Sequence, residues 1–198
     1  MKALLGFLLF SILFLLLLIP YEAKSQEPLT VQAFFFHGMI TSETSMQALK
    51  YLDGKRSVYY LAFDTPGGVI PAGELVMDRM KELQKGGAKI RCIAIGECMS
   101  MGLYIYNACD TLSAYTDAKF MFHEAMAEGQ MTASDMRKMI KELEQDQDRL
   151  DPPLLARLGV TREAFIEHRN KATEWTTLDL IRWAPKYPIK VIQRGERK

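Results

Sequence analysis

The chain has 198 residues, of which 48% are hydrophobic and 25% are charged, and its formal net charge is +1 at pH 7. This composition is ordinary for a globular protein, and the length suits one domain with a real core. Removing residues 1–25, which contain Lys2, Glu22 and Lys24, leaves 23 basic and 23 acidic residues. The sequence therefore shows no basic footprint, and we expect no nucleic-acid partner.

The first 25 residues have the pattern of a signal peptide. Lys2 forms a short positive region, residues 3–19 are almost wholly apolar, and Ala23 and Ser25 are small at the positions that a signal peptidase reads. We expect a periplasmic or secreted protein, cleaved after Ser25, with one domain over residues 26–198. The alternative is an uncleaved anchor that associates the protein with a membrane, since the apolar run is at the short end of what spans a bilayer of about 30 Å.

In chain order, the sequence next predicts a strand over residues 31–36 and a helix over residues 42–52. An apolar strand over residues 58–63 then ends in the turn Asp64-Thr65-Pro66-Gly67-Gly68. An amphipathic helix follows and ends at Gly86-Gly87. The following apolar run, residues 90–95, predicts a second buried strand.

This strand, helix and strand form a βαβ unit, whose right-handed crossover makes its two strands parallel. Both following loops then emerge at one edge of the sheet, and the second loop brings Ser100 to the start of a helix over residues 100–109. A nucleophilic serine needs two amides for the oxyanion and a base for its proton. The N–H groups of Gly68 and Met101 would supply the pair, and His123, which ends a strand over residues 119–122, the base. A lone histidine at a strand end is alternatively a hydrogen-bonded structural group.

The C-terminal third predicts helices and one last strand. Thr132 caps a helix over residues 132–149 with an apolar stripe and a densely charged opposite face. Asp151-Pro152-Pro153 is predicted to end that helix and to start another over residues 154–158. A helix over residues 161–170 and a strand over residues 189–192 complete an α/β fold, in which helices surround a mostly parallel, coiled sheet.

Three motifs occur together: Asp64-Thr65-Pro66-Gly67-Gly68, then Gly96-Glu97-Cys98-Met99-Ser100-Met101-Gly102, then Met121-Phe122-His123. In this order and at these separations they resemble the ClpP-type serine peptidases of the ClpP/crotonase superfamily. The resemblance implies Ser100 as nucleophile, His123 as general base, and Gly68 with Met101 as oxyanion amides. It also implies a peptide or unfolded-protein substrate and no cofactor or metal. The helix over residues 132–149 resembles a handle for homo-oligomer assembly, or it simply covers the sheet.

The chain departs from the family pattern at the third catalytic residue. Alignment on Trp175 puts Thr173 where the family has an acid, and Glu174 is one residue further along. A histidine base needs a partner on its other ring nitrogen. We expect Glu174 to fill this role, with Asp179 in reserve, or the protein to work as a slow Ser-His dyad.

Other functions remain open on sequence grounds. A Ser-Lys dyad would use Lys138 or Lys141 as base, a crotonase-like enzyme would act on a CoA thioester, and a non-catalytic module would bind peptide or support assembly. The three cysteines are an odd number without metal-site spacing. We expect Cys92 and Cys109 to be core thiols, and Cys98, which precedes the helix start, not to be catalytic.

Overall fold

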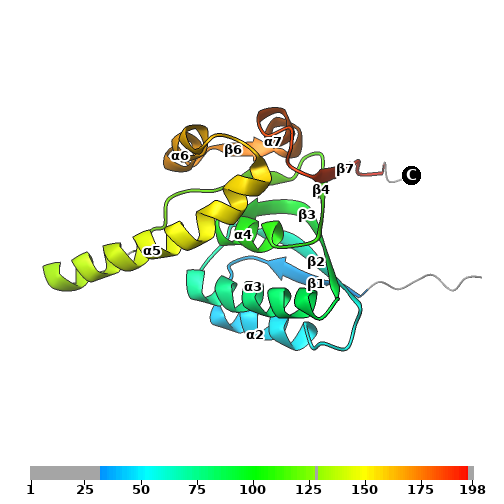
Figure 1. Ribbon diagram of the computed structural model, residues 1–198, viewed down its shortest axis with the longest axis horizontal. Helices are drawn as coiled ribbons and strands as arrows, with labels where there is room; N and C mark the ends of the chain where they lie inside the picture. Colours follow the sequence, from blue (N-terminus) through cyan, green and yellow to red (C-terminus); the bar gives the residue numbers. More distant parts are fainter. Residues whose placement is uncertain (1–31, 128, 196–198) are drawn as a thin grey trace, which may run out of the picture. The chain divides into compact units, whose positions relative to one another are not determined.

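A mostly parallel sheet of seven strands forms the centre of the computed structural model, which describes residues 32–127 and 129–195 (Figure 1). The strands are β1 (Phe34–His37), β2 (Val58–Thr65), β3 (Lys89–Met99), β4 (Thr111–Tyr115), β5 (Lys119–Met121), β6 (Glu174–Thr176) and β7 (Ile189–Ile192). The helices are α2 (Ser42–Tyr51), α3 (Ile70–Lys85), α4 (Met101–Asn107), α5 (Ala133–Leu158), α6 (Arg162–Asn170) and α7 (Thr177–Trp183). The predicted α/β class is confirmed. The predicted signal peptide lies outside the described residues.

Five strands run parallel in the order β1-β2-β3-β4-β7. Besides β2, strand β3 pairs with two further strands: its first half pairs with β4 and its last residues pair with β5. Strand β5 in turn pairs with β6, which runs antiparallel to it. Ser100 directly follows β3, and His123 lies two residues after β5. The pairing of β3 with β5 therefore brings Ser100 and His123 to the same end of the sheet.

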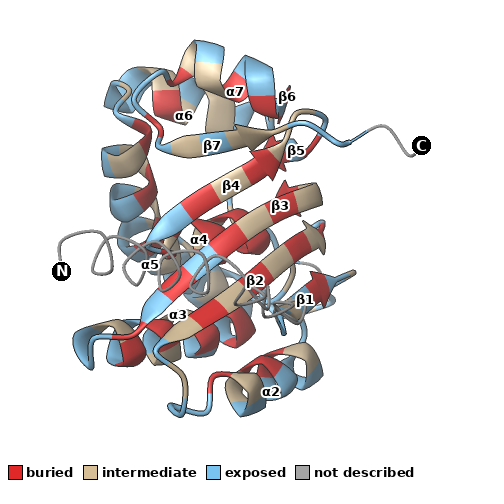
Figure 2. Cartoon of the chain, turned by 90° about the vertical axis from the view of Figure 1, so that its right-hand side faces the viewer, coloured by how far each residue is buried: buried red, intermediate tan, exposed pale blue. Residues whose placement is uncertain are grey.

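The core lies on the face of the sheet that the helices cover (Figure 2). In β2, Tyr59, Leu61 and Phe63 are fully buried, whereas the residues between them are half-buried. The alternation follows from the two-residue period of a strand, which turns neighbouring side chains to opposite faces. Within the described part of the chain, no helix is long and apolar enough to cross a membrane.

The prediction that Pro152 and Pro153 separate two helices is wrong. Helix α5 continues through both prolines, from Ala133 to Leu158, and ends at Gly159 with φ of 68°. Proline removes a helical N–H and crowds the preceding turn, which normally breaks a helix. Here Leu150, Leu154 and Leu158 follow one another at helical spacing on the buried side, so continuous packing against the core keeps the helix in register.

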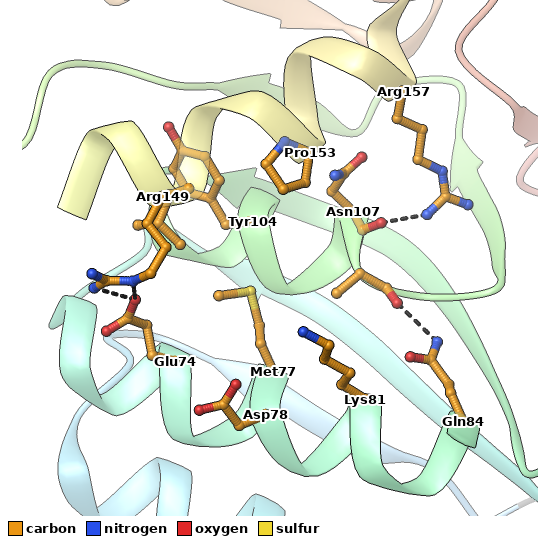
Figure 3. A pocket seen from close by; sticks show the side chains of 12 residues that line it. Glu74, Met77, Asp78, Lys81, Gln84, Tyr104, Asn107, Arg149, Pro153 and Arg157 are labelled. Atoms are coloured by element: carbon orange, nitrogen blue, oxygen red, sulfur yellow. Dashed lines mark hydrogen bonds and ion pairs between the residues drawn. The ribbon is translucent and has the colours of Figure 1, made fainter. Parts of the chain in front are cut away.

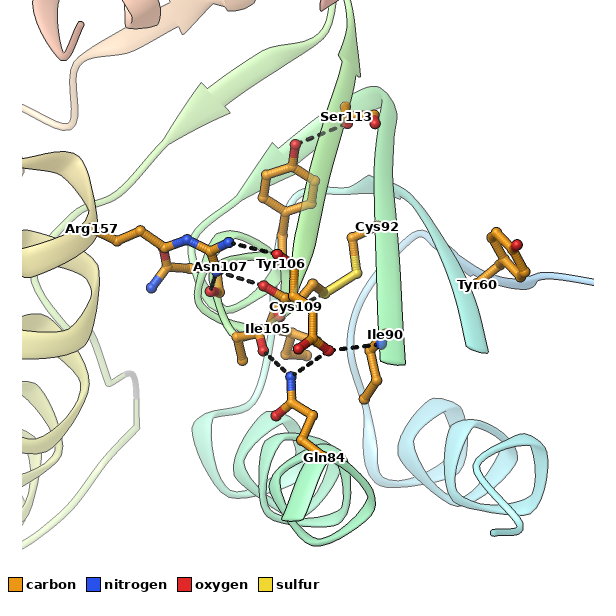
Figure 4. Close-up of a disulfide and its surroundings, with 12 residues drawn as sticks. Tyr60, Gln84, Ile90, Cys92, Ile105, Tyr106, Asn107, Cys109, Ser113 and Arg157 are labelled. Carbon is orange, nitrogen blue, oxygen red and sulfur yellow. Dashed lines mark hydrogen bonds between the residues drawn. A yellow bond between two sulfur atoms is a disulfide. The ribbon is translucent and has the colours of Figure 1, made fainter. Parts of the chain in front are cut away.

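The prediction that Cys92 and Cys109 are core thiols is also wrong, because the two residues form a disulfide (Figure 4). Cys92 lies in β3 and Cys109 follows α4, and their α-carbons are 6.0 Å apart. The sequence placed both residues in buried positions but did not show that α4 folds back against the strand that precedes it. Cys98 is a free, buried cysteine.

Candidate active site

The glycine-rich loop after β2 packs directly against the loop that carries Ser100. Strands β2 and β3 are parallel, so both loops leave the same edge of the sheet. At Gly67, whose φ is +102°, an added Cβ would lie 2.6 Å from the Ser100 Cβ and 3.0 Å from the Met101 nitrogen. Only glycine allows this approach and this backbone conformation. The predicted juxtaposition of Gly67-Gly68 with Ser100 is therefore present.

Two side chains of the first motif make this junction rigid. Asp64 Oδ1 accepts a hydrogen bond of 3.0 Å from the Glu97 N–H, and a Cβ at Gly96 would collide with the same oxygen. Thr65 Oγ1 donates to Gly38 O at 2.6 Å and accepts from the Gly67 N–H at 3.1 Å. Side-chain groups that bond to main-chain atoms in this way fix the shape of a loop.

Ser100 sits in a strained turn between β3 and α4. Its φ of 49° and ψ of −126° lie in a region that non-glycine residues rarely adopt. Its N–H donates to the carbonyl of Met121 at 2.7 Å, which ties it to the strand that leads to His123. Within the described residues, the N–H groups of Gly68 and Met101 have no hydrogen-bond acceptor, as the donors of an oxyanion hole require.

Ser100 and His123 line the same groove, which has a volume of about 640 Å³ and is lined mainly by apolar side chains. Gly68 also lines the groove, and the two carboxylates that line it belong to Glu142 and Asp146. No hydrogen bond joins the Ser100 hydroxyl to the His123 ring among the residues that the structure describes. Contacts of this kind are often loose without substrate and tighten in the reacting complex.

The sequence predicts Glu174 as the partner of His123 on its other ring nitrogen. His123 Nδ1 lies 2.5 Å from the main-chain carbonyl oxygen of Glu124. Glu174 is exposed in β6, opposite Met121, and no hydrogen bond or ion pair joins it to His123 in the described part of the chain. A catalytic role for Glu174 therefore stays a prediction.

The other two candidates for the acid position have partners of their own. Thr173 Oγ1 lies 3.0 Å from His168 Nδ1. Asp179 accepts from the Thr176 hydroxyl at 2.7 Å and forms an exposed ion pair with Arg182, so its side chain faces solvent.

The remaining candidates lie outside the groove. Lys138 pairs with Glu142 at 3.8 Å and is 78% exposed, and neither it nor Lys141 lines the groove, so the structure lends the Ser-Lys dyad no support. Cys98 is fully buried, and this burial raises the pKa of its thiol well above the usual value, which makes it a poor nucleophile. His37 lies 3.3 Å from Asp64 and outside the groove.

A second hollow of about 490 Å³ lies between α3, α4 and α5 (Figure 3). It contains none of the predicted catalytic residues. Both arginines that line it are engaged: Arg149 pairs with Glu74 at 2.6 Å, and Arg157 donates to the carbonyls of Asn107 and Cys109. The hollow is the space where three helices meet, and these contacts hold α5 against α3 and α4.

Sequence reasoning missed the contacts around Glu124. Its carboxylate lies 3.4 Å from the guanidinium of Arg169, which also binds Asp151 at 2.7 Å. Residues so far apart in the chain leave no local pattern, so only the folded structure brings them together.

The comparisons with known proteins agree with this geometry. A sequence model of the family described as "Clp protease" matches residues 31–177. Two proteins named "ATP-dependent Clp protease proteolytic subunit", from Dehalococcoides mccartyi strains BAV1 and CBDB1, are each 28% identical over 134 residues, which is 64% of this chain. The match spans 66% of the length of these relatives.

Proposed function

Because the chain belongs to the Clp protease family, we propose that it is a serine peptidase that cleaves peptide bonds through an acyl-enzyme on Ser100. The observation that carries the proposal is the junction at Gly67. It places a serine on a strained turn beside two main-chain N–H groups that have no acceptor among the described residues. His123 lines the same groove.

The chemistry follows from these positions. His123 Nε2 takes the proton from the Ser100 hydroxyl as its oxygen attacks the substrate carbonyl carbon. The N–H groups of Gly68 and Met101 stabilise the negative charge that develops on the carbonyl oxygen. The imidazolium then gives its proton to the leaving amine, and water, activated by the same ring, releases the acyl group from Ser100.

The substrate, location and assembly complete the proposal. The mainly apolar groove suits a peptide or an unfolded protein segment. The predicted signal peptide supports export to the periplasm or the exterior, or a membrane anchor if it is uncleaved, and a disulfide fits an oxidising compartment. Self-association is supported by α5, whose first half projects from the body and exposes Met136 and Ile140, each 49% exposed (Figure 1).

Labelling with a fluorophosphonate probe tests the proposal. The probe reacts with an activated serine, so peptide mapping of the wild-type protein should find the phosphonate on Ser100. Ser100→Ala should abolish labelling and retain the folded circular-dichroism spectrum, whereas Ser134→Ala, an exposed serine of α5, should label like the wild type. Labelling that persists in Ser100→Ala would show that another residue is the nucleophile.

A non-catalytic peptide-binding or assembly module is the second candidate. Two observations favour it: Thr173 occupies the position of the family acid, and no hydrogen bond joins Ser100 to His123 among the described residues. A folded wild-type protein that never reacts with the probe, but binds unfolded peptide in a fluorescence-anisotropy titration, would support this alternative.

A further inference from the structure

The contact between His123 and Glu124 bears on which ring nitrogen of His123 carries the proton. His123 Nδ1 lies 2.5 Å from the Glu124 carbonyl oxygen, and a carbonyl oxygen can only accept a hydrogen bond. A hydrogen bond to this oxygen requires the proton of the neutral ring on Nδ1, which leaves the lone pair on Nε2. This is the tautomer that a general base for Ser100 requires.

We propose that the Glu124 main-chain carbonyl orients His123 in place of a triad carboxylate, and that Arg169 is a positioning residue that holds Glu124. The inference rests on the proposed function. It gives this chain a third catalytic element that the sequence does not show, because a main-chain oxygen is present at every residue.

Contacts from α6 restrain Glu124. Glu124 Oε1 lies 3.4 Å from Arg169 Nη2. With the side-chain amide of Asn170 oriented to donate, the Asn170 amide nitrogen lies 3.2 Å from the same oxygen. Glu124 is itself 56% exposed, so the pair adds little to the stability of the protein. Its effect is to fix the residue after His123, and with it the direction of the carbonyl.

Arg169 can act as an anchor because it is held from the other side. Its Nη1 lies 2.7 Å from Asp151 Oδ2, and the two side chains are only 16% and 13% exposed. Asp151 Oδ1 in turn accepts a 2.7 Å hydrogen bond from the Tyr104 hydroxyl. Burial, together with the charge of Asp151, raises the pKa of Tyr104, so this hydroxyl remains a donor.

This chain of contacts joins the two halves of the proposed site. Tyr104 belongs to α4, which starts immediately after Ser100, Asp151 belongs to α5, and Arg169 belongs to α6. Through these helices the nucleophile and the residue that orients the base share one rigid support. The family acid position is engaged elsewhere, because Thr173 pairs with His168.

Nuclear magnetic resonance of protein labelled with ¹⁵N-histidine tests the tautomer without any activity measurement. The chain has three histidines, so the His123 signals are assigned by their loss in His123→Gln. We expect the neutral His123 ring to carry its proton on Nδ1. A neutral ring protonated on Nε2 would overturn the proposal, even if Ser100 is labelled.

Inactivation kinetics with the fluorophosphonate test the role of Arg169 and Glu124. Glu124→Ala and Arg169→Met should each lower the maximal inactivation rate by about ten- to a hundredfold, less than the ten-thousandfold known for loss of a triad carboxylate. The half-saturating probe concentration should not change. The double variant should be no slower than the slower single variant, because both changes release the same carbonyl.

Three controls make the result specific. Arg182→Met removes an arginine from an exposed pair on α7 and should leave the rate unchanged. Arg169→Met alone leaves the buried carboxylate of Asp151 without its partner and could prevent folding. The double variant Asp151→Asn with Arg169→Met removes that charge as well and serves in its place. Glu124→Gln keeps a side-chain oxygen for Arg169 and should restore most of the rate.

Unchanged kinetics and an unchanged His123 tautomer in Glu124→Ala, whose exposed side chain the fold does not need, would refute the proposed positioning. A wild-type protein that shows the Nδ1-protonated ring but never reacts with the probe would instead refute the proposed function alone.

Discussion

Breaking the Cys92–Cys109 disulfide should cost a measurable share of the stability of the fold. The bond closes a loop whose ends are 17 residues apart. The loop-closure entropy that such a crosslink removes from the unfolded chain corresponds to about 3 kcal/mol at 25 °C. For a domain of this size, that loss lowers the melting temperature by about 6–12 °C.

The loss should be read from wild-type protein unfolded in guanidinium chloride with and without a reductant. This comparison leaves every side chain in place, so it separates the crosslink from packing effects. The variant Cys92→Ala with Cys109→Ala, compared with reduced wild type, then gives the cost of the two cavities alone. Cys98→Ala removes the free buried cysteine and leaves the disulfide in place. The reductant should therefore lower the stability of this variant as much as it lowers that of the wild type.

Counting thiols decides whether the bond exists in the purified protein. Denatured but unreduced protein should show one reactive thiol, that of Cys98, and three after reduction. Three thiols in unreduced protein from the exported fraction, or a stability difference well below 1 kcal/mol between the oxidised and reduced forms, would refute the reasoning.

The remaining predictions concern the leader, the third catalytic residue and assembly. Intact mass of protein recovered outside the cytoplasm should show a chain that begins after Ser25, and a full-length chain in the membrane fraction would indicate an anchor instead. Glu174→Gln should leave fluorophosphonate labelling unchanged if Glu124 orients His123, whereas a loss of orders of magnitude would assign the acid to Glu174. Light scattering should show an oligomer that Met136→Glu with Ile140→Glu dissociates, because these exposed side chains lie on one stripe of α5, while a control charge at exposed Leu178 should have no effect. A strictly monomeric wild-type mass would refute this.

The sequence was sufficient to predict the elements whose pattern is local. The apolar runs of β2 and β3 and the Gly86-Gly87 stop of α3 predicted the parallel βαβ unit, and strand β7 has the predicted bounds. Because that unit determines which loops share an edge, the meeting of Gly67 with Ser100 followed from the sequence as well.

The features that sequence reasoning missed depend on contacts between distant elements. Pro152 and Pro153 are local helix breakers, and only the buried face of α5 shows why the helix continues. Strand β6 is three residues long and exists through its pairing with β5. The Glu124–Arg169 contact joins residues on a loop and a helix that no periodicity relates.

The backbone strain at Ser100 bears on the proposed function, because the same residue is the proposed nucleophile. A serine at φ of 49° and ψ of −126° costs about 1–3 kcal/mol, whereas glycine adopts a positive φ with little strain. Ser100→Gly should therefore relax the fold while it removes the hydroxyl of the proposed nucleophile. The glycines at positions 67 and 96 are needed for close packing whether or not the protein is an enzyme. In contrast, the hydroxyl of Ser100 has no bonding partner among the described residues, so the proposed catalytic role would give a reason to keep a strained serine at this position.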